Sequence, residues 1–308
     1  MRGRKSGTDR QENGIETRLT EGTGAGREGE RRWRFPALDA PIAHRLAAMA
    51  CTRLNVSMCP ERESDRAPAS RPFLTAEWRD LAMLNFAVSS DLLQPLVPAG
   101  TELDKWRGTT YLSVIGFRFL STRVHGVAVP GHRHFEEVNL RFYVRRLERD
   151  GWRRGVVFIR ELVPRWAIAW AARALYNEPY AALPMRHAIT RAGDGATVRF
   201  EWRRGRSWEG LSLRTSQPPE PLRAESEAEF ISEHFYGYTR QRNGSTMEYR
   251  VEHPPWRVAN ADEAVLRADV STLHAGEFAD ALGGAPRSAF LAQGSPVAVY
   301  PPIRLPDT

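Results

Sequence analysis

A strict alternation of apolar and polar side chains from residue 137 to residue 144 constrains the fold of this chain more than any other feature. The apolar side of the alternation consists of Val138, Leu140, Phe142 and Val144. The polar side consists of Glu137, Asn139, Arg141 and Tyr143. Because side chains in a β-strand point alternately to opposite faces, this stretch predicts a strand whose apolar face lies in a core.

Similar runs predict further strands at 109–119, 155–163, 198–202, 248–253, 264–270 and 297–303. Asp150-Gly151 is typical of a hairpin turn between two of them. Helices are expected at 78–85, 91–94, 165–176 and 227–235. Ser226 and Glu229 have the spacing of a capping box at the start of the last helix. Strands outnumber helices, so the sequence predicts an α+β domain built on an antiparallel or mixed barrel.

The first 72 residues differ from the rest in composition. They contain 14 of the 44 basic and 10 of the 37 acidic residues, which gives them +4 of the net charge of +7. Residues 1–35 contain almost no large apolar side chains, so they cannot bury enough surface to offset the entropy of ordering. We therefore expect residues 1–72 to be a mostly disordered leader rich in arginine and glycine, and residues 73–308 to form a single domain.

Several classes of protein are excluded by what the sequence lacks. The longest apolar run, Trp166 to Ala172, is far shorter than the roughly 20 residues of a membrane-spanning helix. Cys51 and Cys59 are the only cysteines, which favours a cytosolic, reduced setting. His132 and His134 form one pair without further ligands, so no metal is expected. Phosphate-binding loops, zinc-protease and serine-hydrolase motifs are absent, and no cofactor is expected.

The polar side of the alternating strand admits two interpretations. Facing the interior of a barrel, it would present an acid, an amide, a guanidinium and a phenol in one row. Facing solvent, the same residues would form ordinary cross-strand ion pairs. Periodicity alone does not decide between the two.

Three other groups of residues are candidates for a site. Arg160 and Glu161 end a strand before the helix that Arg165 opens, where they either bind an anion or only fix the turn. Tyr176, near Tyr180, would either wall a pocket or pack in the core. His253 follows a strand and is either a functional or a packing histidine.

The stretch from Glu137 to Val144 resembles the bacterial family known as domain of unknown function 2071. Gly155 to Phe158, Leu175-Tyr176 and the run from His253 to Trp256 extend the resemblance to about residues 73–305. That family belongs to the acetoacetate decarboxylase-like superfamily. The resemblance implies a conical β-barrel of antiparallel or mixed strands with flanking helices and an interior pocket, and it favours the interior for the polar row.

The decarboxylase is similar in a more specific way, which also separates its chemistry from this chain. Its reactive lysine follows an Arg-Glu-Leu stretch and a proline, and the matching position here is Arg165. Its pocket carries a glutamate on a neighbouring strand, which Glu137 would match. A guanidinium is not deprotonated in proteins and forms no imine. The two lysines, Lys5 and Lys105, lie in the leader and in a polar loop, so a lysine Schiff base is not expected.

These observations predict a protein that binds a small organic acid or carbonyl compound, with or without acid/base turnover. Arg165 and Arg141 would hold the anionic end, and Glu137 and Glu161 would orient them or transfer protons. Asn139, Tyr143, Arg160, Tyr176 and His253 complete the predicted site. A non-catalytic ligand sensor or scaffold remains an alternative, and nucleic-acid binding through the leader is a disfavoured third. The oligomeric state stays open, a homo-oligomer included.

Overall fold

A computed structural model describes residues 71–308 except 129, 166–176, 178, 270–272, 274–275 and 307–308. The expected leader and the helix expected at 165–176 fall outside the described residues, apart from Arg71, Pro72 and Arg165. Among the described residues, no helix is long and apolar enough to cross a membrane.

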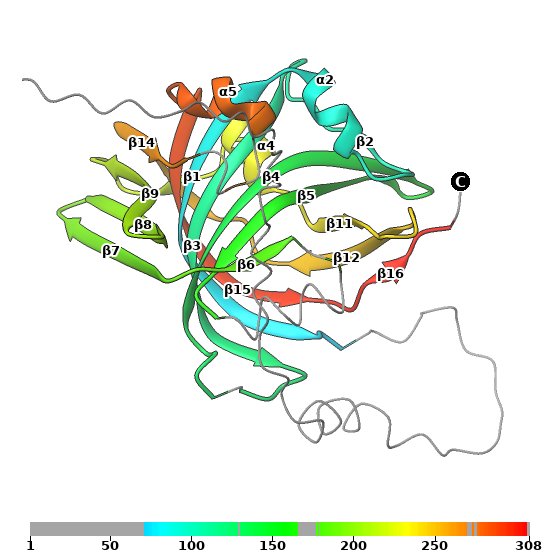
Figure 1. Ribbon diagram of the computed structural model, residues 1–308, viewed down its shortest axis with the longest axis horizontal. Helices are drawn as coiled ribbons and strands as arrows, with labels where there is room; N and C mark the ends of the chain where they lie inside the picture. The colour runs from blue at the N-terminus through cyan, green and yellow to red at the C-terminus, as the bar shows by residue number, and fades with distance from the viewer. Residues whose placement is uncertain are drawn as a thin grey trace, which may run out of the picture. The chain divides into compact units, whose positions relative to one another are not determined.

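Two sheets make up the described fold (Figure 1). The main sheet has twelve strands, which are β1 (Leu74–Val88), β2 (Glu102–Leu103), β3 (Thr110–Val124), β4 (Phe135–Glu148), β5 (Gly151–Val163), β6 (Tyr180–Ala182), β10 (Glu220–Pro221), β11 (Tyr236–Arg240), β12 (Thr246–Glu252), β13 (Arg257–Asn260), β15 (Ser288–Val299) and β16 (Ile303–Arg304). The second sheet has four, which are β7 (Met185–Ala192), β8 (Gly195–Arg204), β9 (Ser207–Thr215) and β14 (Glu263–Arg267).

The described helices are short. They are α2 (Ser90–Leu93), the 3₁₀ turn η1 (Gln94–Leu96), α4 (Glu227–Ser232), the 3₁₀ turn η3 (Gly276–Phe278) and α5 (Ala279–Gly283). The predicted capping at the start of α4 is confirmed, because the backbone N–H of Glu229 donates to Ser226 Oγ at 3.1 Å. The fold is thus mostly β with a few short helices.

The main sheet returns on itself. Its strands pair in the order β15-β1-β3-β4-β5-β11-β12, and β12 also pairs with β15, with Val251 opposite Val299. Most of these pairs are antiparallel, but β5 and β11 run parallel, so the sheet is mixed as predicted. Seven strands therefore form a closed ring of hydrogen-bonded pairs with an inner and an outer face.

Each face of this ring has its own apolar core. An inner cluster joins residues of β1, β3, β4, β5 and β15 with Phe230 and Ile231 of α4. An outer cluster joins the other face of the same strands to the second sheet and to α5. In β4 the predicted apolar side, from Val138 to Val144, belongs to the outer cluster, whereas Phe135 and Tyr143 belong to the inner one.

The helix predicted at 78–85 is wrong, because these residues are the middle of the 15-residue strand β1. Four successive residues, Leu81 to Leu84, are buried, since the strand is covered on both faces. A strand buried on both faces has no alternation, and its continuous apolar run fits helical spacing equally well. The predicted hairpin at Asp150-Gly151 is confirmed, with Glu148 opposite Gly151.

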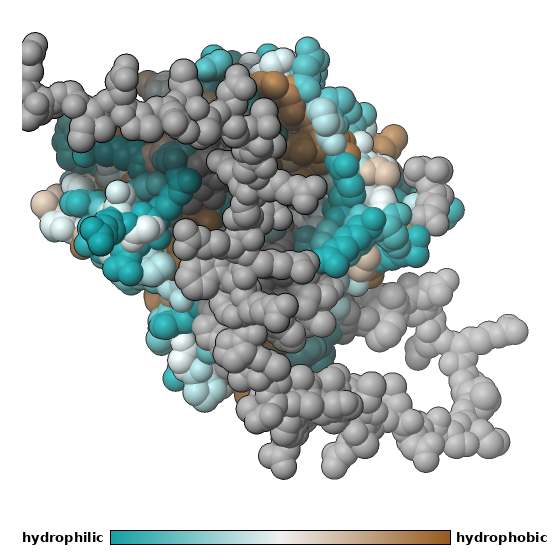
Figure 2. All heavy atoms as spheres, in the orientation of Figure 1, coloured by the Kyte–Doolittle hydropathy of each residue, from teal (hydrophilic) through white to brown (hydrophobic). Residues whose placement is uncertain are grey.

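The second sheet packs on the outer face of the ring through Phe200. A Cβ atom at Gly116 of β3 would lie 2.7 Å from the Phe200 ring, so only glycine leaves room for this contact. Phe200 itself is fully buried. Hydrophilic residues cover most of the second sheet in the view of Figure 2.

Candidate functional site

The polar row of β4 lies on the inner face of the ring and is buried. Glu137 and Asn139 are 3% and 2% exposed, Tyr143 is also buried, and Arg141 is half-buried. The solvent-facing interpretation of this row therefore does not hold. Four polar groups that follow each other along one strand instead occupy a face that otherwise carries an apolar cluster.

Glu137 is held by two donors. Nδ2 of Asn139 and the hydroxyl of Tyr180 each donate to a different oxygen of its carboxylate, both at 3.3 Å. Glu161 is 2% exposed and lies opposite Asn139 across the β4–β5 pair and opposite Tyr180 across the β5–β6 pair. The ring thus brings the two predicted carboxylates, Glu137 and Glu161, into one patch on three adjacent strands.

Arg141 brings a cation to this face. Its Nη2 donates to the carbonyl oxygen of Ile231 at 3.3 Å, and its guanidinium carbon lies 5.5 Å from the centre of the Tyr143 ring. In the part of the chain that the structure describes, no carboxylate lies within 4.0 Å of it. Its Nε is buried without a hydrogen-bond partner, and so is Asn139 Oδ1. Among the described residues, the charge of Arg141 on the inner face therefore has no carboxylate at ion-pair distance.

A second polar group adjoins Arg141 and was not foreseen from the sequence. His234 is buried just after α4, and its Nε2 lies 3.4 Å from Asp104 Oδ2. Arg154 Nε donates to the same oxygen at 2.7 Å. Burial raises the pKa of Asp104, but the contacts with His234 and Arg154 outweigh it and leave that pKa below its ordinary value. Asp104 is therefore a charged partner of Arg154.

Burial lowers the pKa of His234 to about 4, and the charges of Arg154 and Arg141 act in the same direction. Burial also lowers the pKa of His253, again with a contribution from Arg141. The ring of His253 stacks on Trp256 at 4.2 Å between centres, and its Nδ1 is 3.0 Å from the Pro254 carbonyl oxygen. Arg141 thus lies within electrostatic reach of two histidines that are neutral at pH 7.

The hydroxyl of Tyr143 starts a chain of hydrogen bonds across the ring. It donates to Ser113 Oγ at 2.7 Å, and Ser113 donates to Asn85 Oδ1 at 2.7 Å. Asn85 Nδ2 donates to Ser288 Oγ at 3.1 Å, and Ser288 donates to Glu227 at the start of α4. The chain links β4, β3, β1 and β15 and fixes the orientation of the Tyr143 ring beside Arg141.

The structure does not place the other three predicted site residues in the patch of Glu137 and Glu161. Arg160 lies opposite Leu140, whose side chain is on the outer face, so Arg160 is on the other face of β5 from Glu161. Arg165 lies directly after β5 and is exposed. Tyr176 lies outside the described residues, and the roles of Arg160, Arg165 and Tyr176 stay predictions. Within the described residues, no group of three or more His, Cys, Asp or Glu side chains is arranged to hold a metal ion.

Comparison with known proteins gives one family and one curated relative. The model of the family DUF2071, described as an uncharacterized conserved protein, matches residues 75–296. The chain is 26% identical over 201 residues to the uncharacterized protein YqjF of Bacillus subtilis (strain 168), which covers 64% of this chain and 79% of YqjF.

Solved structures share the fold at low sequence identity. Acetoacetate decarboxylase from Legionella pneumophila is similar with a TM-score of 0.52 and 15% identity, over 89% of this chain and 99% of that one. An acetoacetate decarboxylase-like enzyme from Sphingomonas wittichii RW1 gives 0.53 and 14%, over 81% and 100%. The enduracididine biosynthesis enzyme MppR, complexed with pyruvate, gives 0.53 and 11%, over 79% and 94%. At these identities the similarity establishes an acetoacetate decarboxylase-like fold.

Proposed function

The chain belongs to the DUF2071 family, and on that premise we propose that the ring of strands forms a conical barrel whose interior binds a small organic acid or carbonyl compound. A structural relative, MppR, is complexed with pyruvate, which supports a ligand of that size and chemistry. The ligand's anionic end lies at Arg141, and its carbonyl end reaches toward Asn139 and Glu137.

The unneutralised charge of Arg141 carries this proposal. Burying a cation without a counter-ion is costly, and two histidines that are neutral at pH 7 lie nearby. A ligand carboxylate would supply the missing charge and accept from the free Nε. Successive residues on one strand face lie roughly 6.6 Å apart, so a ligand of three or four carbons spans Arg141 and Asn139.

Glu137 and Glu161 are the proposed proton-transfer groups. Both are buried, and Glu137 is oriented by the donors of Asn139 and Tyr180. A carboxylate in that position accepts a proton from the carbon next to a ligand carbonyl without any covalent intermediate. Arg165, exposed in the described structure, is proposed to contribute at the entrance rather than at the reacting carbon.

Isothermal titration with pyruvate, acetoacetate and neutral acetone tests the proposal. We expect the two acids to bind and acetone to bind more weakly, because acetone lacks the carboxylate. Arg141→Gln should weaken binding of the acids at least tenfold. Parallel assays for product formation separate an enzyme from a ligand sensor, since a sensor binds the acid and leaves it unchanged.

Arg145→Gln is the matched control. Arg145 lies on the same strand and the same face as Arg141, but its Nε donates to Glu102 at 2.8 Å, so its charge is already neutralised. Binding should survive that substitution. Failure of both acids to bind the unaltered protein, or equal binding by Arg141→Gln and the unaltered protein, would contradict the proposal.

A further inference from the structure

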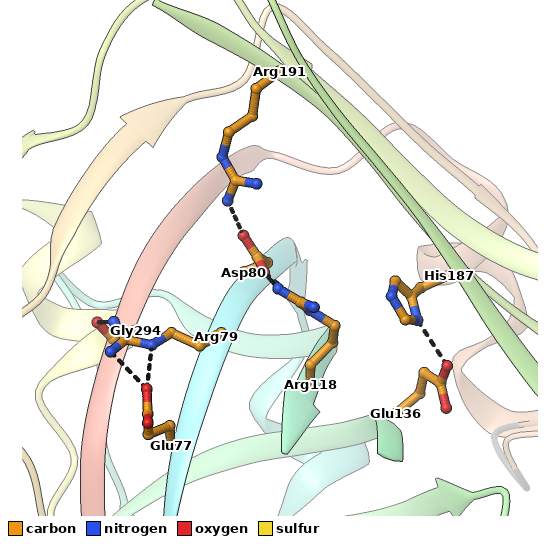
Figure 3. A network of polar contacts seen from close by, with 8 residues as sticks. All are labelled: Glu77, Arg79, Asp80, Arg118, Glu136, His187, Arg191 and Gly294. Carbon is orange, nitrogen blue, oxygen red and sulfur yellow. Dashed lines mark hydrogen bonds and ion pairs between the residues drawn. The ribbon is translucent and has the colours of Figure 1, made fainter. Parts of the chain in front are cut away.

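A polar hollow lies on the outer face of the main sheet, on the opposite side from the inner row. Its volume is about 420 Å³, within the range of small-molecule sites. It is lined by residues of β1, β3, β7 and β15, namely Arg79, Asp80, Arg118, Leu120, Arg191 and Gln293. Three of the six lining residues are arginines, which come from strands far apart in the sequence (Figure 3).

The carboxylate at the centre of this hollow is placed by an irregular backbone. Asp80 has a φ of 58°, in the left-handed region that residues other than glycine rarely adopt, and the β1–β3 register shifts between Arg79 and Ala82. On the neighbouring strand, a Cβ at Gly294 would lie 1.9 Å from the carbonyl oxygen of Trp78. The backbones of β1 and β15 therefore approach each other closely beside Asp80. The bulge places Asp80 on the outer face, only 3% exposed.

Asp80 holds two guanidinium groups in place, one on each oxygen. Nε of Arg118 donates to Oδ2 at 3.0 Å, and Nη2 of Arg118 donates to the same oxygen. Arg191, from β7 of the second sheet, donates through Nη2 to Oδ1. Each guanidinium has five N–H donors, so both keep donors for a further acceptor. One carboxylate between two arginines also leaves one positive charge.

Arg79 also lines the hollow, but its charge is neutralised by Glu77. Its Nε and Nη2 donate to Glu77 Oε2 at 3.0 and 2.8 Å, and its Nη1 donates to the Gly294 carbonyl oxygen at 3.2 Å. The amide of Gln293 supplies a neutral polar group on the same wall. The excess charge of the hollow therefore sits between Arg118 and Arg191.

We propose that this hollow binds a small oxyanion, a carboxylate or phosphate ester, between Arg118 and Arg191. A purely structural role explains the arrangement less well. The Arg191 side chain is 63% exposed, and ion pairs at such exposure contribute little to stability. A buried carboxylate that aligns two guanidinium forks is instead the arrangement that binds planar or tetrahedral oxyanions bidentately.

Titration of the full chain with inorganic phosphate and with succinate at low ionic strength tests this site. We expect at least one of the two anions to bind, and Arg191→Gln to weaken that binding at least tenfold. The better-bound anion identifies the ligand class as a phosphate ester or a dicarboxylate. The melting temperature of Arg191→Gln, expected within a few degrees of the unaltered protein, shows that the variant is folded.

A matched control separates this site from other positive charges. Arg186→Gln removes an arginine of the same strand whose Nε already donates to Glu201 at 2.7 Å, and it should leave anion binding unchanged. The proposal is overturned if neither anion binds, if Arg191→Gln binds as tightly as the unaltered protein, or if Arg186→Gln weakens binding equally.

Discussion

Arg118 on the outer face of the main sheet and Arg141 on the inner face are held in opposite ways. On the outer face Arg118 and Arg191 share the carboxylate of Asp80, so the cations are fixed by an acid of the chain itself. On the inner face Arg141 donates to a backbone carbonyl, and the described residues offer it no carboxylate within ion-pair distance.

This contrast shows that an arginine partly buried in the main sheet is not always paired with a carboxylate of the chain. The outer face joins the ring to the second sheet through an apolar contact at Phe200 and through the ion pair of Arg191 with Asp80. The inner face keeps several buried polar groups close to one unneutralised cation. A face arranged only for stability would pair that cation or replace it with an apolar residue.

The largest effect on stability is expected at the apolar contact between the outer face and the second sheet. Phe200→Ala removes a fully buried ring from the contact with Gly116 and should lower the free energy of unfolding by about 3–5 kcal/mol. Urea denaturation measures the loss. Trp208→Ala, an exposed aromatic of the same sheet, serves as control and should cost far less. A loss below about 1 kcal/mol for Phe200→Ala would mean that the second sheet is not anchored there.

A pH effect of similar size is expected on the inner face. The pKa of His234 is about 4 in the folded protein and about 6.5 in the unfolded chain, which therefore binds the proton first as pH falls. The free energy of unfolding should drop by about 3 kcal/mol between pH 6.5 and pH 4. Asp104, whose pKa is lowered by His234 and Arg154 despite its burial, adds a further loss at still lower pH.

His234→Gln should flatten this part of the pH profile, as measured by denaturation at several pH values. His134→Gln is the control, because His134 is exposed in a loop and its removal should leave the profile nearly unchanged. Identical slopes for His234→Gln and the unaltered protein would show that His234 is not the group responsible.

The hydrogen-bond chain of the inner face predicts a smaller effect. Tyr143→Phe removes the hydroxyl that donates to Ser113 and should cost about 1 kcal/mol of stability. Tyr300→Phe removes a hydroxyl that donates to Glu252 at the surface and should cost less. Equal losses for the two variants would argue that the chain does not order the inner face.

No change at all is expected from imine trapping. Lys105 is exposed, and the sequence resemblance predicts Arg165 at the position of the decarboxylase's reactive lysine. Borohydride reduction in the presence of pyruvate or acetoacetate should leave the mass of the protein unchanged, as read by mass spectrometry. A stoichiometric adduct mapped to Lys105 would contradict the proposed chemistry of the inner face.

The sequence predicts the parts of the molecule that depend on a pattern of residues close together in the chain. The alternation from Glu137 to Val144 identified β4 and its polar row, and the pair Ser226 and Glu229 identified the start of α4. The sequence predicts a helix at 78–85, where the structure has strand β1, because a strand buried on both faces shows no alternation. Alternation also could not say which face of β4 is enclosed, and only the resemblance to a family favoured the interior.

The missed parts of both sites depend on contacts between distant residues. Asp104 and His234 are 130 positions apart, so only the tertiary fold brings them together. The outer hollow depends on a bulge at Asp80, a residue whose positive φ has no sequence signature of the kind that glycine provides. A single histidine or aspartate has no periodicity, so neither could be separated from ordinary surface residues.

A crystal structure of the protein grown with saturating pyruvate tests the central claim most directly. We predict electron density for the acid inside the ring, with its carboxylate within hydrogen-bonding distance of the Arg141 guanidinium and its keto group toward Asn139 and Glu137. An inner face with no density beside Arg141 at saturating pyruvate, or pyruvate bound only elsewhere on the chain, would contradict the claim that this face is a ligand site.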